Sequence, residues 1–225
     1  MDHLYTIQDF WIPLLQVIGI NVVLSGDNAV VIALAARALQ PRQQKAAIFW
    51  GSGAAVVMRI ILTLFAVKLL TLPSLKLIGS VLLLWIGVKL LIAEEEKGDV
   101  RSSSHLLTAI RIIVTADLVM SLDNVIAVAG AARGNLLLLI LSLVISIPLI
   151  VFGATLLMGL MKRFPIIITL GAGLLGWVAG EMAVSDSAVH GWVTNQLPVL
   201  ERLVPAADAL LVLLLGKMFN RKSEA

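Results

Sequence analysis

Two copies of a Ser-x-Asp-Asn motif carry the side chains in this sequence that are best suited to chemistry. The first copy contains Asp27 and Asn28, and the second contains Asp123 and Asn124. Hard divalent cations such as Mn²⁺, Ca²⁺ and Mg²⁺ prefer carboxylate and amide oxygens as ligands. An asparagine amide can also accept through its oxygen while its nitrogen holds a neighbouring carboxylate in place. The motifs therefore predict an all-oxygen cation site, without ranking Mn²⁺ against Ca²⁺.

Helical spacing extends each motif into a polar stripe. The stripes are Asn21, Ser25 and Asn28 in the first copy, and Asp117, Ser121 and Asn124 in the second. Residues at i, i+4 and i+7 share one face of a helix. A polar stripe on an apolar helix predicts a cavity or a partner helix on that side. Simple interhelical hydrogen bonding is the alternative for Asn21 and the two serines.

Four acids stand within long apolar stretches, namely Asp27, Asp117, Asp123 and Glu181. Each costs roughly 2.5–3.5 kcal/mol at the centre of a membrane, so a bundle without a polar task would not need them. The functional interpretation is a hydrophilic site, with Glu181 and Arg59 as candidates for transport or proton coupling. The alternative is a structural ion pair with Arg59, or with Lys89 or Arg111.

Composition indicates that the elements positioning these residues are membrane-spanning helices. Of the 225 residues, 60% are hydrophobic and 14% are charged, against roughly 25% charged in soluble domains. A helix needs about 20 apolar residues to cross the hydrocarbon layer. The predicted spans are 10–36, 46–70, 74–93, 108–132, 136–160, 165–184 and 204–219. The chain has no cysteine, and it shows no nucleotide-binding loop or catalytic triad, so we predict neither an enzyme nor an ATP-driven pump.

The chain also repeats itself. Residues 21–37 align without gaps on residues 117–133, and eight of the 17 pairs are identical. A second match relates Gly79-x-x-Leu-Leu-x-Trp85 to Gly171-x-x-Leu-Leu-x-Trp177. Three spans separate the copies, so the second enters the membrane upside down, as in many secondary transporters. The predicted fold is all-α: a polytopic bundle of about seven helices in one domain, 1–225, with repeats at 10–93 and 108–184 and a C-terminal helix at 204–219.

Basic residues between the spans predict the orientation of the chain. With the N-terminus outside and the C-terminus inside, ten loop lysines and arginines fall on the inner side and four on the outer side. Cytoplasmic loops carry the excess of Lys and Arg, which favours this orientation. The same distribution argues against nucleic-acid binding.

The strings Ser-Gly-Asp-Asn-Ala-Val-Val-Ile-Ala-Leu and Asp-Leu-Val-Met-Ser-Leu-Asp-Asn-Val-Ile-Ala-Val-Ala-Gly resemble the two signature segments of the TerC family, most of all its YjbE-type branch. The resemblance runs from Asn21 to about Glu181. It implies a metal-ion exporter of the bacterial inner membrane, with manganese as the leading substrate. It also implies that Asp27, Asp123 and Asp117 are the acids of the site. Many relatives have an acid where this chain has Asn21, which affects the ligand count.

Together these patterns favour Mn²⁺ efflux by alternating access at paired intramembrane aspartates. The predicted ligands are Asp27, Asp123, Asp117, Asn28, Asn124 and Asn21. The alternatives are export of an organic cation or amino acid, and a role as a membrane metal-delivery or assembly partner. We expect no cofactor apart from the transported ion. We expect the lipid bilayer as the surroundings, and the sequence leaves a homo-oligomer open.

Overall fold

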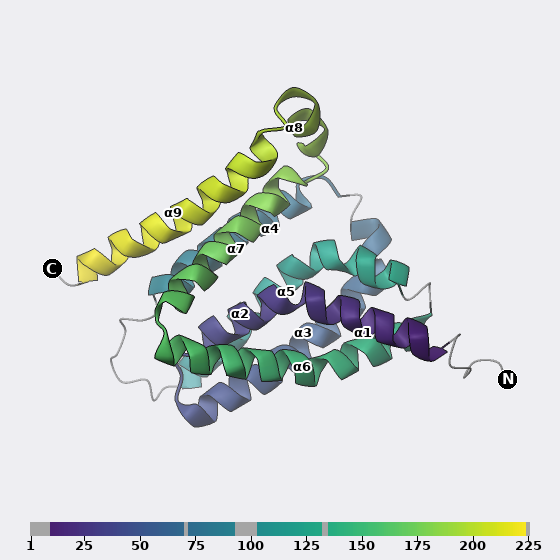
Figure 1. The fold of residues 1–225 in the computed structure, drawn as a ribbon, viewed down its shortest axis with the longest axis horizontal. Helices are drawn as coiled ribbons and strands as arrows, with labels where there is room; N and C mark the ends of the chain where they lie inside the picture. Colours follow the sequence, from purple (N-terminus) through teal and green to yellow (C-terminus); the bar gives the residue numbers. More distant parts are fainter. Residues whose placement is uncertain (1–9, 70–71, 93–102, 132–134, 224–225) are drawn as a thin grey trace.

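The computed structural model describes residues 10–69, 72–92, 103–131 and 135–223, apart from a few side chains within these ranges. Over these residues the chain forms nine helices and no strand (Figure 1). The helices are α1 (Ile12–Leu24), α2 (Gly26–Ala36), α3 (Pro41–Leu69), α4 (Leu75–Ile92), α5 (Ser103–Ala131), α6 (Leu136–Arg163), α7 (Ile166–Val184), α8 (His190–Gln196) and α9 (Leu200–Ser223). The predicted all-α fold is confirmed. The short helix α8 was not predicted, because its seven residues carry no long apolar pattern.

The membrane spans follow the predicted segments closely. Within the described ranges, α3, α4, α5, α6 and α7 are each long and apolar enough to cross a membrane, and α1 and α2 form a sixth span if counted as one bent helix. These segments confirm a multi-pass membrane protein. The predicted seventh span, 204–219, lies within α9, which is not among these candidates.

The helices fall into two groups that are visible in Figure 1. One group contains α1, α2, α3, α5 and α6, with α3 packed on α5 and with α1 and α2 packed on α6. The other contains α4, α7 and α9, which pack on one another. Figure 1 also shows that α1 and α2 run in the opposite direction to α5, as α3 does to α6. The first helix of each half, α1 with α2 or α5, thus packs on the second helix of the other half, α6 or α3.

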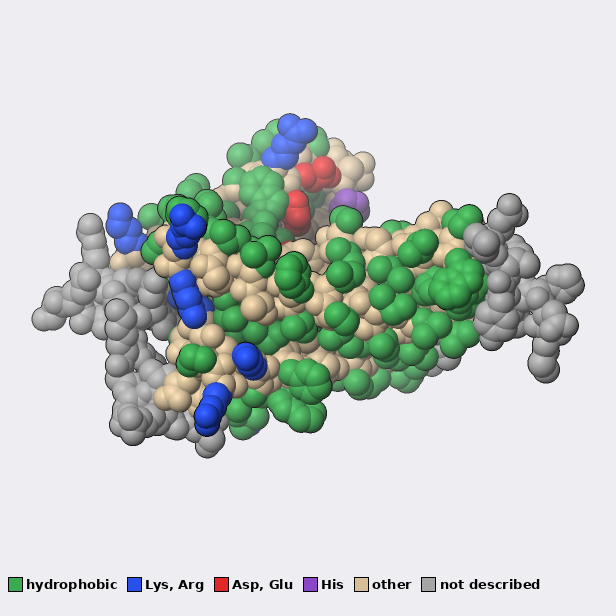
Figure 2. Space-filling view, turned by 60° about the horizontal axis from the view of Figure 1, so that its bottom comes forward, with side chains coloured by type: hydrophobic (Ala, Val, Ile, Leu, Met, Phe, Trp, Pro, Cys, Tyr) green, Lys and Arg blue, Asp and Glu red, His purple; other side chains and the backbone are tan. Residues whose placement is uncertain are grey.

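The surface is apolar along the length of the bundle and basic at one end. Figure 2 shows hydrophobic side chains spread along the length of the described surface, with most of the visible Lys and Arg side chains at the left end of the view. Valine, leucine and phenylalanine side chains are exposed on most of the helices, and Phe152 on α6 is 69% exposed. Such a surface is unfavourable in water and suits contact with lipid chains.

Two glycines of α7 let α9 approach closely, as the Gly176-x-x-x-Gly180 pattern predicts. A Cβ atom added to Gly176 would lie 2.6 Å from the carbonyl oxygen of Asp208, and one added to Gly180 would lie 2.7 Å from the nitrogen of Pro205. Small residues at such crossings allow two backbones to touch. The contact holds α9 along α7.

Asp186 fixes the beginning of α4 from the connection between α7 and α8. Its buried carboxylate accepts hydrogen bonds from the backbone N–H groups of Ser74 (3.1 Å), Lys76 (2.9 Å) and Leu77 (3.2 Å), and from that of Ala188 (2.8 Å). The first N–H groups of a helix have no partner within the helix, so an acid placed there satisfies them. Asp186 thereby ties α4 to α7.

This cap predicts acid sensitivity. Burial opposes ionisation of Asp186, but the four N–H donors outweigh it and hold its pKa below the ordinary value. Because the pKa of Asp186 is lower in the folded state, its ionisation stabilises the fold above the unfolded-state pKa of about 3.9. This stabilisation is lost as the pH falls from that value through the lower folded-state pKa. We expect the melting temperature in detergent to fall steeply below about pH 4 and less steeply in Asp186→Asn. Equal slopes in the two proteins would contradict the role of the cap.

Candidate functional site

The first motif breaks its own helix. Between α1 and α2, Ser25 adopts φ −107° and ψ 8°, and the two helices meet at an angle of 49°. Gly26 follows directly, and Ser/Gly pairs are common points of helix kinking. In the second motif Leu122 stands in place of this glycine, and α5 continues without a break.

Asn124 of the second motif closes the break in the first. Its amide nitrogen donates to the carbonyl oxygen of Leu24, the last residue of α1, at 3.0 Å. Backbone carbonyls at a helix break need a partner when no water is present. This hydrogen bond places Asn124 of the second motif against the helix break at which the first motif begins.

Asp27 lies in the first turn of α2, next to the break. One of its carboxylate oxygens accepts a hydrogen bond from the backbone N–H of Asn28 at 2.8 Å. The N-terminal end of a helix carries partial positive charge, which favours a carboxylate at this position. Two residues before Asp27, the hydroxyl of Ser25 accepts a hydrogen bond from Arg59 of α3, so this acid lies next to the polar cluster described below.

Arg59 of α3 joins the two motifs. Its guanidinium donates to Ser121 Oγ at 3.0 Å and to Ser25 Oγ at 3.0 Å, and it forms an ion pair with Asp117. Ser121 Oγ in turn donates to the other oxygen of Asp117 at 3.3 Å. All four side chains are buried. The ion pair that the sequence left as an alternative is thus present for Asp117.

Two asparagines keep buried polar atoms without a partner in the described structure. Both amide atoms of Asn28 are unpartnered, and the residue is only 2% exposed. Asn21 donates to Ser142 Oγ at 3.1 Å, but its own amide oxygen has no partner. A buried polar group without a hydrogen bond costs about 1–3 kcal/mol. These atoms are therefore available to an ion or to water.

Two predicted residues are not placed in this cluster. Glu181 lies on α7 with an exposed side chain, and its carboxylate accepts a hydrogen bond from Trp177 Nε1 at 2.8 Å. Asp123 lies on α5, but its side chain is outside the described part of the structure. Among the described side chains, no group of three or more His, Asp or Glu could hold a metal ion. The predicted set of three aspartates stays a prediction, because Asp123 belongs to it.

Sequence reasoning missed the contribution of α6. Ser142 accepts from Asn21, and Ser146, one turn later, donates to the backbone oxygen of Ser142 at 2.7 Å. Both serines are buried. Their spacing of four residues within an apolar span was the available signal, since it places both hydroxyls on one face.

Comparison with known proteins identifies the family of the chain. Residues 6–224 match the model of the integral membrane protein TerC family. The chain is 46% identical over 206 residues to the uncharacterized membrane protein YjbE of Bacillus subtilis, covering 89% of this chain and 92% of the relative. It is 25% identical over 198 residues to the UPF0053 inner membrane protein YgdQ of Escherichia coli K12, covering 80% and 83% of the two chains. No solved structure matches it. The chain belongs to the TerC family of integral membrane proteins.

Proposed function

We propose that this protein is a secondary transporter that exports a divalent cation, with Mn²⁺ as the leading substrate. The observation that carries the proposal is the buried cluster in which Arg59 binds Asp117 and the two motif serines, with Asp27 close by in the first turn of α2. Acids within membrane spans are expensive and mark ion or proton pathways. A membrane protein of this family is consistent with a transporter, and the cluster favours a cation as its substrate.

The charges of the cluster suit a divalent ion. If Asp123 completes the site as the sequence predicts, three aspartates would carry three negative charges against the one positive charge of Arg59, which leaves two negative charges. Oxygen ligands come from the carboxylates and from the unpartnered amide oxygens of Asn21 and Asn28. Mn²⁺, Ca²⁺ and Mg²⁺ accept such ligands. In this conformation the guanidinium of Arg59 neutralises Asp117, so an incoming cation would compete with it.

The architecture supports alternating access through an inverted repeat. In the predicted repeats, 10–93 and 108–184, the equivalent helices run in opposite directions and have exchanged packing partners. Binding sites of such transporters lie where the repeats meet. Arg37 directly follows α2, Arg42 lies in the first turn of α3, and Lys162 and Arg163 end α6, and these helix ends lie together at the left of Figure 1. This end would face the cytoplasm.

Transport by reconstituted protein tests the proposal. Inverted vesicles would be supplied with Mn²⁺, Ca²⁺, Mg²⁺ or the organic cation tetramethylammonium. We expect Mn²⁺ uptake that falls at least about tenfold, equivalent to 1.4 kcal/mol, in Asp27→Asn and Asp123→Asn. Glu201→Gln removes an exposed acid far along the chain and should leave uptake unchanged. Unimpaired uptake by both aspartate variants would refute the role of these acids.

Other outcomes of the same panel identify the alternatives. Uptake of the organic cation in place of the metal ions would indicate an organic-cation exporter. Failure to take up or bind any divalent ion, together with stable co-purification of another membrane protein, would indicate a metal-delivery or assembly partner. Either result would reject the proposed substrate.

A further inference from the structure

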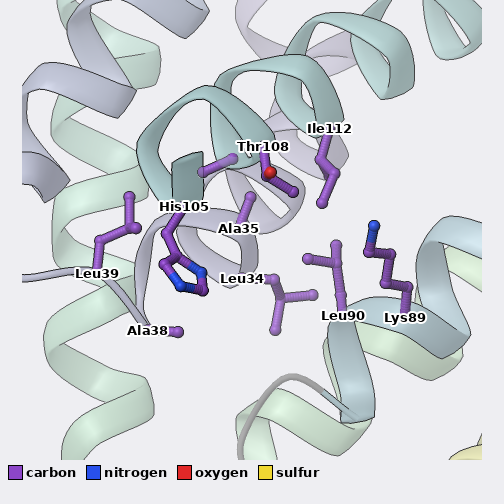
Figure 3. Close-up of a pocket in the computed structure, with 10 residues that line it drawn as sticks. Leu34, Ala35, Ala38, Leu39, Lys89, Leu90, His105, Thr108 and Ile112 are labelled. Atoms are coloured by element: carbon purple, nitrogen blue, oxygen red, sulfur yellow. The ribbon is translucent and has the colours of Figure 1, made fainter. Parts of the chain in front are cut away.

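We infer that the pocket shown in Figure 3 is a second, closed mouth of the ion pathway, equivalent by the internal repeat to a groove that is open in this structure. The inference deepens the proposed function and rests on it for the identity of the ion. It assigns the pocket to the passage of the divalent cation at the basic end of the molecule.

The open groove lies between α1 and the C-terminal part of α5. It has a volume of about 780 Å³, and its lining includes Gln16, Val23, Leu24, Gly130 and Ala131. Leu24 is the residue whose carbonyl oxygen binds the Asn124 amide. The groove therefore reaches the helix break beside Ser25, at the edge of the polar cluster.

The pocket in Figure 3 lies between α2, α4 and the N-terminal part of α5. It has a volume of about 130 Å³, and its lining includes Leu34, Ala35, Lys89, His105 and Ile112. The internal repeat makes the position of this pocket equivalent to that of the groove. The two hollows differ roughly sixfold in volume.

The 96-residue offset of the repeat relates the two linings residue by residue. Leu34 corresponds to Gly130, Ala35 to Ala131, and Ile112 to Gln16, one turn beyond the 17 aligned positions. The pocket is lined by Leu34, Ala35 and Ile112. The groove is lined by their equivalents Gly130, Ala131 and Gln16. Leu34, which is 1% exposed, fills the space that Gly130 leaves open.

One pair shows that packing, and not only side-chain size, makes the difference. Val23 and Val119 are equivalent and identical, yet Val23 is 80% exposed and Val119 is 5% exposed. Val119 is covered by α4, where a Cβ atom added to Gly79 would lie 3.0 Å from Val119 Cγ1. The equivalent glycine of α7, Gly171, instead faces Val30, with 2.9 Å to its Cγ1. Val30 lies two helical turns after Val23, so this contact with α7 leaves Val23 uncovered.

The unpartnered amide of Asn28 indicates how the two halves would exchange conformations. Its equivalent, Asn124, holds the carbonyl oxygen of Leu24 because α1 ends there. For Asn28 the equivalent acceptor is the carbonyl of Met120, but α5 is unbroken at that point. In the second state α5 bends near Ser121, Asn28 binds the Met120 carbonyl, the pocket widens and the groove closes. Two conformations of similar energy are what alternating access requires.

A disulfide that holds α5 against α4 tests the movement. The chain has no cysteine, so Gly79→Cys with Val119→Cys would place the only two thiols at a close contact. We expect the oxidised protein to lose at least about tenfold of its Mn²⁺ transport and to recover it on reduction. Gly173→Cys with Leu213→Cys joins α7 to α9, where a Cβ atom added to Gly173 would lie 3.7 Å from Leu213 Cδ1, and should leave transport intact. Equal transport by the oxidised and reduced Gly79/Val119 protein would overturn the inference.

Thiol labelling tests the pocket without any transport. Leu34→Cys and Leu175→Cys each replace a leucine that is at most 1% exposed, but only Leu34 lines the pocket. A membrane-impermeant maleimide added to inverted vesicles should label Leu34→Cys at least about ten times faster. Equal protection of both thiols would overturn the inference even if Mn²⁺ is transported. Labelling of Leu34→Cys in a protein that moves no divalent ion would uphold the pocket and reject the proposed substrate.

Discussion

Replacing Arg59 with methionine is expected to lower the free energy of unfolding by about 3–5 kcal/mol, because the substitution leaves the carboxylate of Asp117 buried without its partner. Arg59 also donates to Ser25 and Ser121, so both hydroxyls would lose a donor at the same time. Thermal unfolding in detergent micelles would measure the change. Arg202→Met removes an exposed arginine from α9 and should change stability by no more than about 0.5 kcal/mol.

The double variant Arg59→Met/Asp117→Leu separates stability from function. Replacing a buried ion pair with apolar residues of similar volume is often neutral or stabilising. We therefore expect the double variant to unfold near the temperature of the parent protein while transporting no Mn²⁺. A double variant as unstable as Arg59→Met would show that the cluster serves mainly to hold the helices together, which would weaken the transport proposal.

The second large effect is expected at the crossing of α7 and α9. Gly180→Ala adds one methyl group against the backbone of Pro205, which cannot move without displacing α9. Overpacking of this kind costs typically about 1–3 kcal/mol. We expect a lower melting temperature and faster protease cleavage of the connection between α8 and α9.

Gly159 provides the matched control for this prediction. It also lies within a membrane helix, α6, but a Cβ atom added there meets nothing within 4 Å. Alanine favours a helix over glycine by up to about 1 kcal/mol, so Gly159→Ala should be neutral or slightly stabilising. If Gly180→Ala were equally harmless, the close approach of α9 to α7 would be wrong.

The sequence predicted the all-α fold and its multiple membrane spans correctly. Long apolar stretches between basic turns predict membrane spans, because hydrogen bonds within a helix are the way a single segment satisfies its backbone in lipid. Ser25-Gly26 favours the break between α1 and α2 for a similarly local reason. The prediction of a seventh span over 204–219 is not confirmed, since α9 is not among the candidate spans.

The partners of the polar residues could not be predicted in the same way. The sequence left Arg59, Lys89 and Arg111 as possible ion-pair partners of the acids. Arg59 is the partner of Asp117 because α3 packs against α5. Asp186 gave no signal, because three of its four donors lie far away along the chain, at the beginning of α4, and the fourth lies in its own loop. Glu181 looked equivalent to the other acids, yet its side chain is exposed on α7.

What the sequence by itself determined is the set of helices, the family and the repeated motif, because each depends on residue types at short spacing. Only the tertiary structure decided that the two copies of the motif differ, with Val23 exposed and Val119 buried. The physical reason is that identical segments acquire different neighbours. Gly79 packs on α5 at Val119, whereas Gly171 packs on α2 at Val30, and no local pattern in the chain records that choice.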